Sequence, residues 1–375
     1  MNNIDKLLKQ LCTNILEYLN DRDLPNDRGI TAPLLFLLAF YEQSDDDKLA
    51  IVCQQLMDEM VERAAKTVDF TPQNIRNVIS SAWLFQSLQD REVIPATETF
   101  FLDFTDNYLS VASDYLAAQE KFTHDNGLTA IGHYWLKRKN ITAIQKTIQL
   151  LKMKVQTVEN GTGWPTFSSE DYRFILDMGY SHGNMGIIEF LARCRDYKIE
   201  TITCTSLISG YIALLANSAE RQYNHQDQTG YDTYQLKYTG SDNLVYTNSS
   251  LWPLISETQV AATLLPIINL ALNFDKNGQS ETLNLAEQLK MYFMLEGSHH
   301  SFSREALSAR DRCAANIIIA LKKNTSNICG LTPGYGNGIV GLPGIGLVLM
   351  AAQKNDKRLQ SLFGFELPTW ITNYL

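Results

Sequence analysis

Apolar residues recur every three or four positions over most of the chain, which is the spacing of one face of an α-helix. In Met1–Asn20, for example, the apolar positions are Ile4, Leu7, Leu8, Leu11, Ile15 and Leu19. The same pattern predicts amphipathic helices in Lys48–Lys66, Thr97–Ala118, Ile141–Val158, Ser206–Arg221, Glu281–Leu295 and Leu359–Leu375. Strand-like alternation is scarce, so we expect an all-α fold.

A second kind of predicted helix is more apolar and begins at a small or glycine-containing segment. These helices start near Gly29, Asn77, Asn126, Gly179, Ser250, Ser301 and Gly336, at intervals of 35 to 71 residues. Paired helices at such intervals are typical of a helical repeat, in which the apolar members line the inside. Neither end of the chain has the polar repeat that caps an open solenoid. The sequence therefore favours a closed α/α toroid of seven inner and seven outer helices, forming a single domain over residues 1–375.

Two short segments interrupt the helical pattern. Residues 231–247 alternate like strands on either side of Gly240-Ser-Asp-Asn, which predicts a small β-hairpin insertion. Asn160-Gly-Thr-Gly-Trp-Pro is expected to be a loop because of its glycine and proline content.

Composition excludes several classes of partner. The 375 residues are 45% hydrophobic, enough for a large core, and 32 Lys and Arg against 41 Asp and Glu give a net charge of −9. Nucleic acid is not expected as a partner, because phosphate binding needs a positive surface. No transmembrane segment or secretory signal is expected, because no long uncharged apolar run occurs. The six cysteines contain no CxxC pair, which indicates reduced, mostly buried thiols and a cytoplasmic location.

The clearest candidate for chemistry is His182, which lies between glycines just before an apolar helix. Histidine is suited to proton transfer near neutral pH, and glycines let a backbone approach closely. The alternative is a hydrogen-bonded structural histidine at a helix start.

The segment around His182 resembles the lanthionine synthetase C-like family of lanthipeptide cyclases. Its residues Gly179-Tyr-Ser-His182-Gly183-Asn-Met-Gly186 match that family's Gly-x-x-His-Gly-x-x-Gly pattern, and Gly163-Trp-Pro-Thr-Phe and the last repeat, Gly334 to Gly346, are also similar. The resemblance implies an α/α toroid that adds a peptide cysteine thiol to a dehydroamino acid, giving a thioether ring. It also implies a zinc ion that holds the thiolate. His182 is then the catalytic acid, and Asp125 corresponds to an acidic residue that supports it; a plain helix N-cap is the alternative for Asp125.

The zinc ligands are where this sequence departs from the family. By spacing, the family's Trp-Cys motif falls on Trp252 and Pro253, and proline cannot bind a metal. The family's Cys-His pair falls on His299 and His300. A catalytic zinc needs about three protein ligands, so a third donor is required from His182, Glu257 or Glu296. Whether zinc is bound therefore stays open, and without it no cofactor is expected.

Three functions stay open after this reading. The first is a cyclase acting on a dehydrated precursor peptide in lanthipeptide maturation. The second is a non-catalytic, cyclase-derived scaffold that binds a precursor peptide or a partner enzyme such as a dehydratase. The third is a carbohydrate-active toroid, which needs two carboxylates roughly 5–9.5 Å apart. Its candidates are Asp125, Glu257, Glu296 and Glu305, and no spacing singles out a pair.

Overall fold

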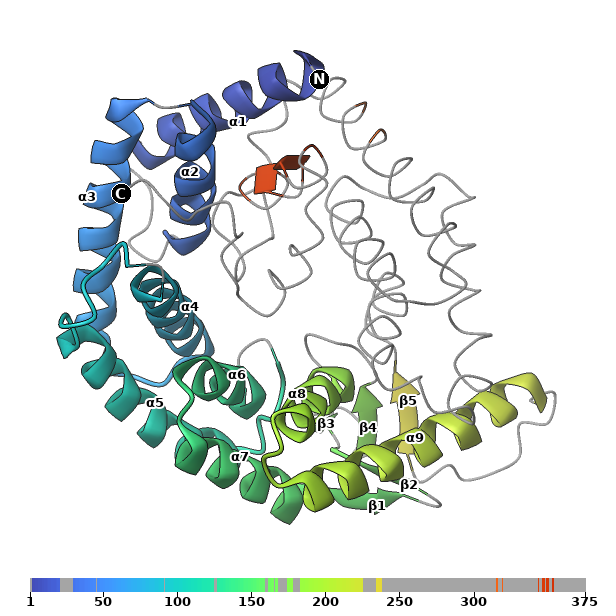
Figure 1. Ribbon diagram of the computed structural model, residues 1–375. Helices are drawn as coiled ribbons and strands as arrows, with labels where there is room; N and C mark the ends of the chain where they lie inside the picture. The colour runs from blue at the N-terminus through green and yellow to red at the C-terminus, as the bar shows by residue number, and fades with distance from the viewer. Residues whose placement is uncertain are drawn as a thin grey trace. The chain divides into compact units, whose positions relative to one another are not determined.

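The computed structural model describes most of the N-terminal 60% of the chain and a few positions near the C-terminus (Figure 1). The described residues are 2–20, 30–44, 46–90, 92–124, 127–158, 161–164, 166–167, 174–177, 183–224 and 234–237, and residues 315, 319, 343, 346, 347, 349, 350 and 353. They fall into two compact units, residues 1–108 with 277–375 and residues 109–276, and each unit is considered by itself below.

Most of the described residues are helical. The helices are α1 (Asn2–Asn20), α2 (Thr31–Ser44), α3 (Asp47–Ala65), α4 (Pro72–Gln89), α5 (Phe100–Ala118), α6 (Leu128–Arg138), α7 (Ile141–Lys154), α8 (Asn184–Asp196) and α9 (Thr201–Asn224). Several begin at the residues that favour helix starts. The side chains of Asp46, Thr71 and Asn140 accept hydrogen bonds from backbone N–H groups in the first turns of α3, α4 and α7.

The predicted alternation of apolar and amphipathic helices is confirmed in the described residues. Helix α2 is buried along almost its whole length, as are much of α4, α6 and α8, whereas α1, α3 and α7 bury one face and expose the other. In the first unit α2 contacts both α3 and α4. In the second unit α6 contacts α7 and α8, and α7 contacts α9. Helices that are two apart in the sequence thus contact each other within each unit, as they do in stacked helical hairpins.

Several helix boundaries differ from the sequence prediction; α9, for example, spans Thr201–Asn224 rather than Ser206–Arg221. Helix α4 begins at Pro72 rather than Asn77, because Thr71 caps it and proline suits the first helical position. Helix α7 ends at Lys154 rather than Val158, because the backbone becomes extended at Val155 and enters a strand. The helices expected at Ser250, Glu281–Leu295 and Leu359–Leu375 lie outside the described residues.

Short strands follow α7. Strands β1 (Gln156–Val158) and β2 (Gly161–Gly163) pair antiparallel, so the prediction of a loop at Asn160–Pro165 is wrong for β2. Strands of three residues are too short to show alternation, and glycine gives no strand signal. Strand β4 (Phe174–Asp177) pairs antiparallel with β3 (Thr166–Phe167) and parallel with β5 (Tyr234–Lys237). β5 confirms one strand within residues 231–247, and residues 238–247, where the second strand of the hairpin is expected, lie outside the described residues.

In the first unit, helical residues near the C-terminus pack against the N-terminal helices. Leu347, Leu349 and Met350 are buried, and the Gln353 side-chain amide donates a hydrogen bond of 2.7 Å to the Asp5 carboxylate of α1. Gly346 lies so close to α2 that a Cβ atom there would come within 2.2 Å of the Phe36 ring. The described residues between 346 and 353 are therefore in direct contact with α1 and α2.

The four described cysteines, Cys12, Cys53, Cys194 and Cys204, are buried free thiols, as expected from the sequence. Burial raises the pKa of Cys12 to about 11, with a further contribution from Asp46. Burial, and then Cys12, raises the pKa of Cys53 to about 12, so neither thiol is a nucleophile at neutral pH. Among the described helices, none has both the length and the apolar character needed to cross a membrane.

The close approach of Gly346 to Phe36 gives a first prediction. Gly346→Ala forces a methyl group against the fully buried Phe36 ring, and we expect it to lower the free energy of unfolding by about 1–3 kcal/mol. Chemical denaturation measures this difference. Gln54→Ala, which removes an exposed hydrogen bond to Asp58 within α3, is the control and should change stability by less than about 0.5 kcal/mol. Equal stability of Gly346→Ala and the native protein would contradict the packing of Gly346 against Phe36 of α2.

Candidate functional site

The residues that the sequence singles out for chemistry fall outside the described part of the chain. This holds for His182 and Asp125, for the candidate metal ligands His299 and His300, and for Pro253. The residues that flank two of these positions are described. Asp125 directly follows His124 in the loop before α6, and His182 directly precedes Gly183 at the start of α8.

Helices α6 and α8 begin in the same way. Gly127 caps α6 with φ −113° and ψ −167°, and Gly183 caps α8 with φ −126° and ψ −167°, in each case without a capping side chain. At Gly127 an added Cβ atom would lie 2.4 Å from the backbone nitrogen of Thr123, so close backbone packing requires glycine there. The two helices thus have equivalent starts, and their residues can be matched by distance from the capping glycine.

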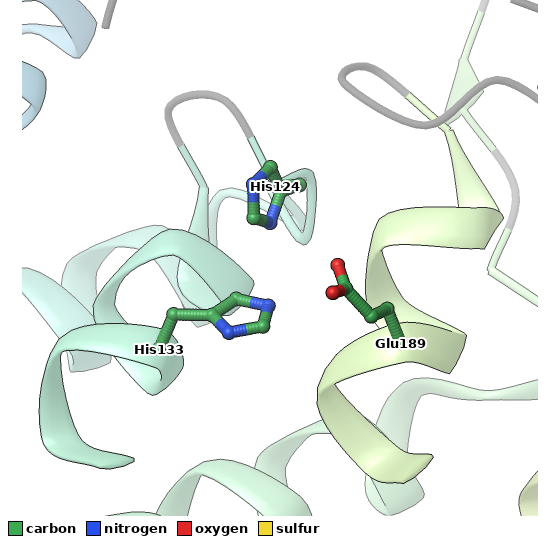
Figure 2. A group of neighbouring side chains, drawn as sticks. All are labelled: His124, His133 and Glu189. Atoms are coloured by element: carbon green, nitrogen blue, oxygen red, sulfur yellow. The ribbon is translucent and has the colours of Figure 1, made fainter. Parts of the chain in front are cut away.

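That equivalence brings two polar side chains together. His133 on α6 and Glu189 on α8 each lie six residues beyond their capping glycine, and α6 packs against α8. His124, from the loop before α6, completes a group of three (Figure 2). One possible ligand atom from each of the three side chains lies within 4.8 Å of the other two. All three residues are buried, with 6–8% of their surface exposed.

Neighbouring side chains fix the orientation of this cluster, which consists of His124, His133 and Glu189. The two imidazole rings meet edge to face, with centroids 4.7 Å apart, and the Phe190 ring packs edge-on against His133 at 5.6 Å. Arg193, one turn beyond Glu189 on α8, donates from Nε at 3.1 Å and from Nη2 at 2.7 Å to the same carboxylate oxygen. The carboxylate is therefore held in place by a partly buried ion pair.

Burial also decides the protonation state of His133. Desolvation, followed by the neighbouring His124 and by Arg193, lowers the pKa of its imidazole well below the ordinary value, against the opposing effect of Glu189. His133 is consequently neutral at neutral pH. Its buried Nε2 atom has no hydrogen-bond partner among the described residues. A neutral imidazole beside a second imidazole and a carboxylate is able to bind a metal ion or to exchange a proton.

The structure also joins the two sequence motifs on which the family resemblance depends. The Asn184 side chain, at the start of α8, accepts a hydrogen bond of 2.7 Å from the Trp164 backbone N–H and donates one of 3.0 Å to the Trp164 carbonyl. The Trp164 indole N–H in turn donates to the Leu151 carbonyl at the end of α7, at 2.9 Å. The Gly-Trp-Pro segment and the helix after His182 are thereby tied together in a buried environment.

The cluster was not found from the sequence, although a signal for it exists. His133 and Glu189 follow Asn126-Gly127 and His182-Gly183 at the same offset, so aligning the two repeats on their glycines pairs them. His124 gives no such signal, because its place depends on how the loop before α6 folds back.

A separate cavity of about 640 Å³ lies in the first unit, and none of the three cluster residues lines it. It is lined mainly by apolar side chains of α3, α4 and α5, among them Met57, Val61 and Phe101. Its acidic lining residues are Asp58, Glu62 and Glu98, and its lining contains neither histidine nor cysteine. The His124, His133 and Glu189 cluster is therefore the better candidate for chemistry.

No protein-family model matches the chain, and no curated protein matches it. The similarity to the lanthionine synthetase C-like family is therefore limited to sequence motifs.

The hydrogen bonds of Asn184 give a second prediction. Asn184→Ala leaves the buried backbone N–H and carbonyl of Trp164 without these partners, and each such loss costs about 1–3 kcal/mol. We expect a clear fall in unfolding free energy, measured by chemical denaturation. Asn14→Ala on α1, which removes an exposed side-chain hydrogen bond to Gln10, is the matched control and should have little effect. Indistinguishable stabilities of the two variants would contradict the role given to Asn184.

Proposed function

We propose that the chain is a lanthionine synthetase C-like cyclase of lanthipeptide maturation, which adds a cysteine thiol to a dehydroamino acid of a precursor peptide. The observation that carries this proposal is the connection between its two family-like motifs. The motif that contains His182 leads into the buried helix α8, and Asn184 of that motif is hydrogen-bonded to Trp164 of the other. Two motifs that lie 20 residues apart in the sequence are thus joined directly.

We also propose that the fold is the closed α/α toroid, with seven inner and seven outer helices in one domain. Two observations support it. Buried and amphipathic helices alternate along the described chain, and alternate helices contact each other within each unit. The contacts of Gly346 with α2 and of Gln353 with α1 bring residues near the C-terminus against the N-terminal helices, as closure of a ring would require.

In the proposed reaction, the cysteine sulfur attacks the β-carbon of the dehydroamino acid and forms the C–S bond. The electron pair of the C=C bond moves toward the adjacent carbonyl, giving an enolate. His182 delivers a proton to the α-carbon, and Asp125 supports His182. The thiol loses the proton that balances this transfer, so the net change is addition of S–H across the double bond, with no oxidant or reductant. A thiol with an ordinary pKa of ~8.5 needs only modest help to ionise, so His182 is also able to act as the base.

One observation favours the alternative of a non-catalytic scaffold. Pro253 stands where spacing places a cysteine ligand of the family, and His299 stands in place of another, so the thiolate ligands are lost. A chain of this kind would hold a precursor peptide or a dehydratase without catalysing ring formation.

A single-turnover assay separates the two functions. The protein is incubated with a peptide containing one dehydroalanine and one cysteine, and unreacted thiol is then alkylated. Ring formation leaves the peptide mass unchanged, so mass spectrometry detects it as loss of alkylation. We expect the native protein to accelerate the loss, and His182→Ala to slow it by roughly 10²–10⁴-fold, as for removal of a general acid or base.

The control for this assay is His225→Ala, which changes a histidine outside the motif and should react at the native rate. Acceleration that survives in His182→Ala would contradict the role of His182. Binding of the peptide without any acceleration would instead select the scaffold function.

A further inference from the structure

We propose that His124, His133 and Glu189 form a binding site for a divalent transition-metal ion, with zinc as the expected occupant. The site lies within one unit, and all three ligands are described residues. It differs from the site that spacing suggests at His299 and His300. The proposal does not depend on the proposed function, because it concerns metal binding alone.

The donor set is that of a catalytic zinc site. Two imidazole nitrogens and one carboxylate oxygen give three protein ligands, which leaves a fourth tetrahedral position for water or a substrate. At zinc bond lengths of about 2.0–2.1 Å, tetrahedral ligand atoms lie about 3.4 Å apart. The ligand atoms here lie within 4.8 Å of one another, so side-chain movements of about an ångström close the site around an ion.

Burial supplies the reason why an ion belongs there. Buried polar atoms are nearly always hydrogen-bonded, because loss of water without a replacement partner is costly. The Nε2 atom of His133 is buried without a partner among the described residues, and Figure 2 shows its ring facing the Glu189 carboxylate and the His124 ring. A metal ion at the point where the three side chains converge would give the buried His133 Nε2 atom a partner.

The surrounding residues act as the supporting layer that metal ligands need. Arg193 holds the Glu189 carboxylate through two donor atoms, and Phe190 packs against the His133 ring. Such partners orient ligands for a metal. The positive charge of Arg193 also reduces the net negative charge near the ion. We therefore expect a weaker affinity than in zinc sites rich in thiolates.

Cobalt is the probe for this site, because its absorption spectrum reports the ligands. The full-length protein is stripped with a chelator, dialysed and titrated with Co²⁺, and zinc is counted by mass spectrometry in a parallel sample. We expect one ion per chain and tetrahedral d–d absorption without thiolate-to-cobalt charge transfer. Glu189→Gln and His133→Gln should each weaken binding by more than the 10–100-fold typical of losing a supporting residue.

Two kinds of control make the result specific. Arg193→Gln removes the ion pair and keeps the carboxylate ligand, so it should still bind one ion per chain and shows what loss of the pair alone does. His299→Gln and His300→Gln should bind as the native protein does. Thermal unfolding of each variant in the presence of chelator checks that it folds. If His133→Gln does not fold, the isosteric Glu189→Gln variant still tests the site.

Absence of binding by the native protein would overturn the proposal. So would binding that survives in Glu189→Gln and is lost in His299→Gln or His300→Gln, or cobalt spectra with thiolate bands. The outcome is separate from that of the cyclisation assay. Metal binding at this cluster without ring formation would leave the site standing and remove the proposed function, whereas ring formation by a protein that binds no metal would do the reverse.

Discussion

The proposed metal site of His124, His133 and Glu189 depends on the close packing of α6 against α8. Gly132 makes this possible, because a Cβ atom there would come within 2.7 Å of the Phe190 ring. With the helices in contact, His133 and Glu189 meet, each six residues beyond the capping glycine of its helix. A larger side chain at position 132 would push Phe190 outward, and with it the ring contact that orients His133. The chemistry available at this place is thus a consequence of how tightly two buried helices approach each other.

Burying these three polar side chains has a free-energy cost, which neighbouring groups partly offset. Three polar side chains with at most 8% of their surface exposed would be destabilising if each had to give up water without compensation. Arg193 compensates Glu189 in part, and the two imidazoles contact each other edge to face. Burial keeps His133 neutral, which leaves its ring nitrogen able to donate an electron pair. The same burial that threatens stability therefore prepares the group for binding a cation.

Sequence periodicity predicts the helices well where one apolar face is required, as in α1 and α3. It fails at boundaries that depend on local chemistry, such as the Thr71-Pro72 start of α4, and at strands of three residues such as β2. The cluster was missed because its members come from two helices and a loop, so no short motif contains them. His182 and Asp125, which the sequence does single out, adjoin in the chain the described residues Gly183 and His124. Motif reading and structure thus lead to the same two helix starts, by different residues.

X-ray absorption at the zinc edge of the purified full-length protein is the sharpest test of this metal centre, because it reports ligand type without mutation. A first shell of nitrogen and oxygen at about 2.0–2.1 Å is expected, with multiple-scattering features from two imidazoles. A zinc–sulfur distance of about 2.3 Å would show that cysteines hold the ion, and zinc-free protein that takes up no added zinc would show that no site exists. Either result would contradict a metal centre built from His124, His133 and Glu189.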